Sequence, residues 1–310
     1  MKVTDRTRGY RGSPPRSGAL KRPCLPITLL LTAWLSGCGV ARQTVVPLDQ
    51  LPFPAKAVSR SELLDNLSAN SQSIDTLTAT IRLEASGGVL TTGTLTSYRE
   101  TRGFLIVERP SHIRMKGEAP LALATVFDMV SDGEVFRVSV PLQNTFIVGA
   151  TDTVGTSDNA ILNLRPQHVL DALFVDVRGY LSNPQILSVM EESFEGRRSF
   201  YVFSFVDSKT SVPRLIEKVW IDRRNLTISR KQMFGVLGAV ETDVTYSSYK
   251  AFNGVPFPQH IFIRRPVEDY SLRIEFLKTA LNGVLPDNPF FLPAPIGSDL
   301  IRVGDAKSDH

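Results

Sequence analysis

The stretch Thr76-Leu-Thr-Ala-Thr-Ile-Arg-Leu83 decides the fold class of this chain. Leu77, Ala79, Ile81 and Leu83 alternate with three threonines and an arginine. Successive side chains of a β-strand point to opposite faces, so this alternation places all the apolar side chains on one face. The stretch therefore predicts a strand that is buried on one side only.

Similar short segments follow along most of the chain, separated by residues that favour turns. Asp132-Gly133 and Asn253-Gly254 suit tight hairpin turns, because glycine adopts a positive φ at little cost. Regularly spaced short strands are typical of a sandwich or barrel, so we expect a mainly β fold with a few helices. Further strands are expected at residues 89–99, 103–108, 113–116, 127–131, 135–140, 145–148, 199–206, 218–222, 227–234, 240–249, 259–264 and 270–276.

Two segments have helical rather than strand periodicity. Ser59 and Glu62 have the spacing of a capping box, and the leucines of residues 63–67 share one face of a helix that runs to about Ser71. A proline opens a second amphipathic segment, Pro166–Phe174, and proline is well tolerated in a first helical turn. A large antiparallel sheet tends to curl and to leave an apolar trough. The two helices are therefore candidate covers for such a trough.

The first 37 residues have the organisation of an export signal. Seven basic residues and one acidic residue precede a short apolar run, Leu25–Leu35, which is too short to span a bilayer. The run ends in Leu35-Ser-Gly-Cys38, which resembles the bacterial lipobox, where the cysteine is acylated. An ordinary signal peptide with a chance cysteine, or an uncleaved anchor, is the alternative. We expect cleavage before Cys38 and a lipid anchor on it.

The export signal also explains the charge of the chain. The net charge is +4, but without residues 1–37 it becomes −2, so there is no argument for nucleic-acid binding. Cys24 would leave with the signal and Cys38 would carry lipid, so no thiol would remain for a disulfide, a metal site or a nucleophile. The expected organisation is a signal peptide at 1–37, a lipidated N-terminus and linker at 38–58, one β domain at 59–295 and a flexible tail at 296–310.

No constellation of residues points to catalysis. The four histidines lack metal-ligand spacing, and the chain has neither a glycine-rich nucleotide loop nor a Gly-x-Ser-x-Gly motif. We expect Glu191 and Glu192 in a solvated helix or loop rather than in a catalytic pair, because adjacent residues do not share a helical face. The sequence predicts no catalytic residue, no metal site and no cofactor, and we expect that the protein is not an enzyme.

The stretches Gly103-Phe-Leu-Ile-Val-Glu-Arg-Pro110 and Val130-Ser-Asp-Gly133 resemble the Lol lipoprotein-sorting family, which includes LolA and LolB. In that family a strand ends in Arg-Pro, and a further strand and a loop lead to a Val-Ser-Asp-Gly turn. The C-terminal half is similar more loosely, at Trp220-Ile-Asp222, Tyr246-Ser-Ser-Tyr249 and Gly254-Val-Pro256. The resemblance implies a half-open antiparallel β-barrel whose apolar hollow is covered by a helical lid.

The resemblance also implies roles for residues at two places. Arg109 matches the arginine that, in LolA, hydrogen-bonds the lid helices and holds the cavity closed, and a guanidinium has five donors for carbonyls at helix ends. A solvent-facing arginine at a strand end is the alternative. Leu121 and Leu123 lie where LolB has a protruding loop with an exposed leucine that promotes membrane insertion. For these leucines the alternative is a strand packed into the core.

An acyl chain in the implied hollow would contact apolar side chains from several strands. Which side of each strand faces the hollow depends on strand pairing, so some of the expected residues can belong to a filled core instead. The expected lining of the ligand site consists of Leu77, Ile81, Ile106, Val107, Met115, Phe127, Met129, Phe136 and Val138.

The resemblance implies a lipid-anchored protein on the periplasmic face of the outer membrane that takes part in transfer of lipoproteins or lipids. Gly39 after the cysteine is compatible with outer-membrane sorting. The implied partners are the acyl chains of lipoproteins or free lipid, the membrane through the N-terminal lipid anchor, and a periplasmic carrier protein, with no nucleic acid. A non-transport envelope lipoprotein, such as a stress sensor or a structural partner of an outer-membrane assembly, is the alternative, and an enzyme with an unrecognised site is a third.

Overall fold

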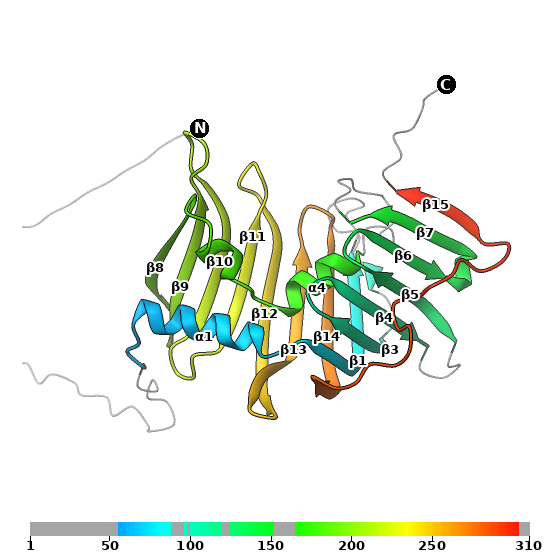
Figure 1. Cartoon of the computed structure of the whole chain (residues 1–310), viewed down its shortest axis with the longest axis horizontal. Coiled ribbons are helices and arrows are strands. Elements are labelled where there is room, and N and C mark those ends of the chain that lie inside the picture. The colour runs from blue at the N-terminus through cyan, green and yellow to red at the C-terminus, as the bar shows by residue number, and fades with distance from the viewer. Residues whose placement is uncertain (1–54, 88–95, 98–99, 120–123, 152–164, 304–310) are drawn as a thin grey trace, which may run out of the picture. The chain divides into compact units, whose positions relative to one another are not determined.

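The alternating stretch forms strand β1 (Thr76–Gly87), which buries Leu77, Ala79, Ile81 and Leu83 on one face. Figure 1 shows the computed structural model that contains this strand. The structure describes residues 55–87, 96–97, 100–119, 124–151 and 165–303, all of which lie in one compact unit of the chain. Cys38 and the expected signal peptide lie outside these residues.

The described strands form one 15-stranded sheet that is not closed into a barrel. Their order is β15-β7-β6-β5-β4-β3-β1-β14-β13-β12-β11-β10-β9-β8, with β2 paired to β1. All neighbours are antiparallel except β15 and β7. The other strands are β2 (Thr96–Ser97), β3 (Thr101–Glu108), β4 (His112–Glu118), β5 (Thr125–Ser131), β6 (Val135–Val140), β7 (Thr145–Ala150), β8 (Ile186–Glu195), β9 (Arg198–Asp207), β10 (Arg214–Asp222), β11 (Ile228–Phe234), β12 (Val240–Phe252), β13 (Val255–Arg265), β14 (Tyr270–Leu281) and β15 (Asp299–Val303).

Strand β1 joins the two halves of the sheet. It pairs with β3 on one side and with β14, almost two hundred residues later in the chain, on the other. An ion pair between Arg82 and Glu275 links β1 and β14 on the face opposite Ile81. The prediction of a mainly β fold with an antiparallel, half-open sheet is confirmed.

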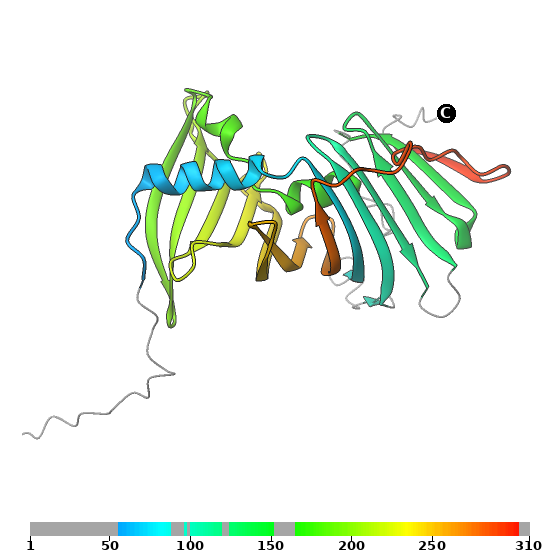
Figure 2. The same cartoon turned by 60° about the horizontal axis from the view of Figure 1, so that its bottom comes forward.

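The helices cover the apolar face of this sheet. Helix α1 (Arg60–Gln72) begins at Ser59, whose hydroxyl accepts a hydrogen bond from the backbone N–H of Glu62. Figures 1 and 2 both show α1 lying across strands β9 to β12. Helix α4 (Pro166–Leu173) and the short helix α5 (Arg178–Leu181) follow one another, and a 3-10 turn, η2 (Pro141–Gln143), links β6 and β7. Both predicted helices are therefore present.

One apolar core connects the helices with both halves of the sheet. Leu63 and Leu67 of α1 and Leu170 of α4 belong to the same buried cluster as Ile81 of β1 and Phe203 of β9. Each of these side chains is at least 95% buried. No helix among the described residues is long and apolar enough to span a membrane.

Two strands were not predicted from the sequence. Strand β8 lies at the edge of the sheet and contains Glu191 and Glu192, so the expected helix or loop there is wrong. Its side chains on both faces are at least partly exposed, and Leu187 and Val189 face solvent, so the strand lacks the polar and apolar alternation that reveals a half-buried strand. Asp299–Val303, within the expected loose tail, form β15, because their backbone pairs with β7.

Replacing Ile81 by alanine should lower the free energy of unfolding by about 2–5 kcal/mol, because Ile81 is fully buried where the two halves meet. Urea titration of a Cys38→Ser form, which cannot be acylated, measures this change. Thr80→Val, on the other face of the same strand, is the matched control and should change the value by less than about 0.5 kcal/mol. Equal effects of the two substitutions would contradict the burial of this face of β1.

Candidate functional site

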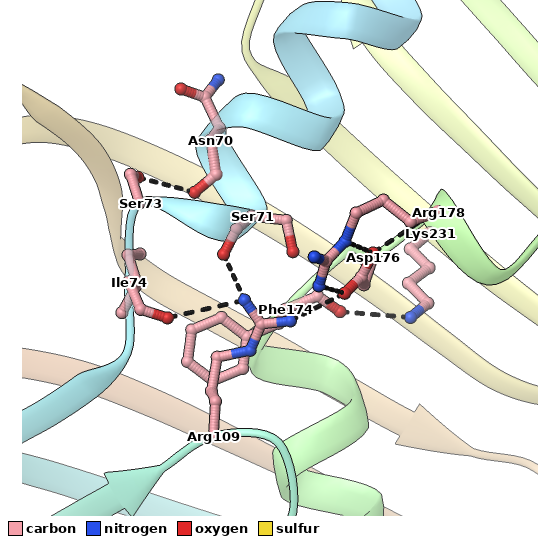
Figure 3. A network of polar contacts seen from close by, with 9 residues as sticks. All are labelled: Asn70, Ser71, Ser73, Ile74, Arg109, Phe174, Asp176, Arg178 and Lys231. Atoms are coloured by element: carbon pink, nitrogen blue, oxygen red, sulfur yellow. Dashed lines mark hydrogen bonds and ion pairs between the residues drawn. The ribbon is translucent and has the colours of Figure 1, made fainter. Parts of the chain in front are cut away.

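Arg109 lies at the corner between β3 and β4 and reaches the end of α1 (Figure 3). Its Nη1 donates to the backbone carbonyl of Ser71, in the last turn of α1, and to that of Ile74 at 3.5 Å. The last carbonyls of a helix have no partner within the helix and carry partial negative charge. A guanidinium at this position therefore satisfies and neutralises the C-terminal end of α1.

The same guanidinium also contacts the segment between α4 and α5. Its Nη2 donates to Asp176 Oδ2 at 2.8 Å. The guanidinium carbon, Cζ, lies 5.1 Å from the centre of the Phe174 ring. Hydrogen bonds from Arg178, together with the charge of Arg109, hold the pKa of Asp176 at about 2, so this carboxylate is ionised at neutral pH. Arg109 thus joins the two covers of the sheet through one side chain, and we call these contacts the Arg109 cluster.

A second set of contacts ties α4 to the sheet. Lys231 of β11 donates to the carbonyls of Asp171 and Phe174, at 3.0 and 3.3 Å, and lies 3.5 Å from Glu217 Oε2. Tyr180 of α5 donates to the same Glu217 oxygen at 3.1 Å. Burial raises the pKa of Glu217 despite the nearby lysine. Because Lys231 and Glu217 are both buried, this end of α4 is anchored inside the core.

A cavity of about 290 Å³ lies between α1, the residues after α4 and the strands beneath them. Most of its wall is apolar, and we call it the α1 cavity. Ser71, Ile74 and Phe174 belong both to this wall and to the Arg109 cluster, so the cluster lies at one end of the cavity. The apolar part of the wall consists of Leu63, Leu67, Ile74, Leu173, Phe174, Val175, Ile221, Leu226, Ile228, Tyr246, Tyr249, Pro256, Phe257 and Pro258.

None of the residues expected from the sequence to line a ligand site borders the α1 cavity. Seven of them are buried in the common core together with α4: Leu77, Ile81, Val107, Met115, Met129, Phe136 and Val138. Phe127 is partly buried and packs against that core.

Ile106 differs from the other expected lining residues. It lies on the opposite face of β3 from Leu105 and Val107, beside the half-exposed Phe104. The alternation within β3 was visible in the sequence, but strand pairing was needed to show which of the two sets faces inward.

The cavity wall comes instead from α1 and the C-terminal strands. Ile221 and Phe257 line it from β10 and β13, and Leu63 and Leu67 line it from α1. The helical spacing of the leucines was recognised in the sequence. Their position in the wall of the cavity follows only from where α1 crosses the sheet.

Leu121 and Leu123, expected to form a membrane-insertion loop, lie outside the described residues. The residues that flank this segment are joined, because the backbone N–H of Ala119 donates to the carbonyl of Ala124 at 2.9 Å. The segment connects β4 and β5.

His168 on α4 is partly buried, close to two arginines. Its Nδ1 lies 3.1 Å from the hydroxyl oxygen of Tyr270. Burial, and then the charges of Arg265 and Arg165, lower the pKa of His168 from 6.5 to about 3. The imidazole is therefore neutral in the folded protein at neutral pH.

Comparisons with solved structures identify the fold. A domain named as an outer membrane lipoprotein-sorting protein, from Vibrio parahaemolyticus, is 10% identical with a TM-score of 0.50, and the match covers 74% of this chain and 94% of that one. A LolA-superfamily protein from Nitrosomonas europaea is 12% identical with a TM-score of 0.46, over 76% of this chain and 99% of that one. No protein-family model matches the chain, and no curated protein matches its sequence. The resemblance expected from the sequence is confirmed at the level of the fold.

Arg109→Leu should loosen α1, because it removes the donors to Ser71 and Ile74 and the ion pair with Asp176. Hydrogen bonds to charged groups contribute roughly 1.5–3 kcal/mol each, so amide exchange in the last turn of α1 should rise about tenfold or more. Hydrogen–deuterium exchange with mass spectrometry measures this. Arg137→Leu, which removes a partly exposed arginine outside the cluster, is the control. Unchanged exchange in Arg109→Leu would show that the cluster does not hold α1.

His168 should make the protein sensitive to acid. Between pH 6.5 and about 3 the unfolded state binds a proton at this histidine and the folded state does not, so stability falls as the pH falls through this window. The slope should reach about 1.4 kcal/mol per pH unit. Urea titrations of the parent and of His168→Gln at a series of pH values measure the difference in slope. If the free energy of unfolding changed with pH equally in the two forms, a lowered pKa of His168 would be contradicted.

Proposed function

We propose that this protein is a membrane-anchored lipoprotein that binds acyl chains in the α1 cavity and takes part in moving lipoproteins or lipids to the outer membrane. The observation that carries the proposal is an apolar cavity whose roof, α1, is held at one end by the Arg109 cluster. The fold supports it, because the matched domain from Vibrio parahaemolyticus is named for lipoprotein sorting.

The cavity suits an acyl chain by its chemistry. An acyl chain has no polar group along its length, so it needs an apolar wall and no specific hydrogen bonds. Ligand pockets usually measure about 300–1,000 Å³, and the α1 cavity, at about 290 Å³, is near the lower limit. We therefore expect α1 to move outward when a long chain enters.

The free energy gained when an acyl chain enters the cavity is comparable with the free energy lost when α1 moves outward. Each buried methylene contributes about 0.8 kcal/mol, so ten of them contribute about 8 kcal/mol. Opening would break the contacts of Arg109, at roughly 1.5–3 kcal/mol for each hydrogen bond to a charged group. A bound chain can thus offset the loss of the cluster, and release then requires an apolar acceptor such as a membrane.

The expected anchor fits this role. We propose that Cys38 carries lipid, which places the domain at a membrane surface where acyl chains are accepted or delivered. The first described residues are bonded to the sheet: Tyr201 donates to the carbonyl of Lys56, and the backbone N–H of Val58 donates to the Tyr201 hydroxyl. The linker therefore meets the folded domain at β9, close to α1. A location on the periplasmic face of the outer membrane, delivery by a periplasmic carrier, and membrane insertion by Leu121 and Leu123 belong to the same proposal.

The Cys38→Ser form should bind N-phenyl-1-naphthylamine, an uncharged fluorophore that brightens in apolar surroundings, in a saturable way. Leu67→Trp should reduce its affinity about tenfold or more, because the larger side chain would fill space beneath α1. Fluorescence titration measures both.

Leu142→Trp is the matched control, because Leu142 is exposed, lies in the 3-10 turn η2 and is not part of the cavity wall. It should leave the affinity unchanged. Arg109→Leu should speed both uptake and release of the probe in stopped-flow measurements. Absence of saturable binding in the parent form would reject the proposed function.

A further inference from the structure

A second hollow, of about 800 Å³, lies over the C-terminal strands. Val219 and Ile221 of β10 point into the core, whereas Trp220 between them belongs to a separate cluster and lines this hollow. The hollow therefore opens on the face of the sheet away from the core. Because four of its lining side chains are arginines, we call it the arginine groove; they are Arg198, Arg224, Arg230 and Arg264.

Two buried carboxylates hold these arginines in pairs. Asp222 Oδ2 accepts from Arg224 at 2.7 Å and from Arg198 at 2.9 Å. The side chain of Asp222 is only 3% exposed. Although burial opposes ionisation, the hydrogen bonds from the two arginines together hold the pKa of Asp222 at about 2. The first pair of guanidiniums therefore shares one partner that is ionised at neutral pH.

The second pair has the same arrangement. Asp243 Oδ2 accepts from Arg230 and from Arg264, each at 2.7 Å. The side chain of Asp243 is 5% exposed, whereas that of Arg264 is 56% exposed. With Glu195 also in the wall, four guanidiniums face three carboxylates, so the groove retains net positive charge.

Two of the aromatic rings in the wall of the groove, those of Trp220 and Phe200, lie beneath its arginines. Arg230 lies 5.1 Å from the centre of the Trp220 ring, and Arg198 lies 4.8 Å from that of Phe200. These rings are thus covered and are not free to stack on a sugar. What the groove offers a ligand is guanidinium N–H donors, which suit a phosphate or carboxylate.

The arginine groove and the α1 cavity adjoin. Their walls share Asn225, Thr227, Ile228, Tyr246 and Tyr249. At this point β11 has not yet begun to pair with β12: its first pairing with β12 is Arg230 with Thr245. Residues 246–252 of β12, apart from Ser248, pair with β13 but not with β11. The two hollows therefore meet where the sheet has a gap in its strand pairing, between β12 and the turn before β11.

We propose that a single amphiphile occupies both hollows, with an anionic phosphate headgroup in the arginine groove and its acyl tail in the α1 cavity. The headgroup would bind within the groove, where Arg198 and Arg264 are the two most exposed of the four arginines, and the tail would pass the residues that the two walls share. This inference rests on the proposed acyl-chain site, and it adds that the ligand is a phosphate-bearing lipid rather than an uncharged one.

Displacement of N-phenyl-1-naphthylamine from the Cys38→Ser form tests the inference. The competitors are monopalmitoylglycerol and palmitoyl lysophosphatidic acid, which share one acyl chain and differ by a phosphate. The phosphate lipid should displace the probe at an about tenfold or more lower concentration. This preference should weaken as salt is added, because salt screens exposed charges.

The Arg198→Gln/Arg264→Gln double variant removes two guanidiniums while each buried aspartate keeps its other arginine. It should bring the two competitors to within about threefold of each other and leave displacement by monopalmitoylglycerol unchanged. Arg137→Gln/Arg214→Gln, which loses the same charge outside both walls, is the matched control and should keep the full preference.

The outcomes separate this inference from the proposed function. Equal displacement by the two lipids in the parent form, with saturable probe binding intact, would overturn the phosphate-lipid inference and leave acyl binding standing. A preference that survives in the Arg198→Gln/Arg264→Gln variant would overturn it as well. Calorimetric titration with inorganic phosphate distinguishes the source of the anion: binding as tight as that of lysophosphatidic acid would show a free-phosphate site and would also overturn the inference. Loss of all probe binding in the parent form would instead reject the proposed function.

Discussion

The pairing of β1 with β14 is the constraint on which the rest of the structure depends. It joins segments almost two hundred residues apart, and without it strands β8 to β14 would form a sheet separate from that of β1 to β7 and β15, each with an additional open edge. Closing so long a loop costs conformational entropy that only extensive burial can offset. Leu77, Ile81 and Leu83 of β1 provide part of that burial, and they belong to the one core that spans both halves.

That continuous core determines how the helices cover the sheet. Both α1 and α4 bury an apolar face, but their polar anchors differ in kind. Lys231 and Glu217, which hold the end of α4, are almost fully buried, and separating a buried ion pair leaves a charge without a partner at a cost of about 3–5 kcal/mol. The contacts of Arg109 with Ser71 and Asp176 are only partly buried. Because such contacts exchange more readily with water, α1 is the cover better suited to move, and it is also the one that roofs the cavity.

Much of the fold could be predicted from the sequence, but the residues that line the α1 cavity could not. The alternation in β1 and the capping-box spacing at Ser59 are local patterns, and both elements formed where they were expected. Resemblance pointed to Arg109, and its guanidinium does lie between the two covers. Ile106 was placed among the expected lining residues, yet Leu105 and Val107 face inward, because the side of a strand that becomes buried depends on its neighbours. Strand β8 was not predicted, because an edge strand that is exposed on both faces has no alternation of polar and apolar residues.

The sequence by itself determined the class of fold, since strand periodicity, turn residues and helix caps act over a few neighbouring residues. It also supplied the expectation of an acylated Cys38, which rests on the local order of charges, apolar residues and the cysteine. Only the tertiary structure decided where α1 crosses the sheet, that the cavity lies beneath it, and that Arg198, Arg224, Arg230 and Arg264 gather in one groove beside it. These features combine residues from strands whose order and register are settled by burial across the whole sheet, and no local pattern contains that information.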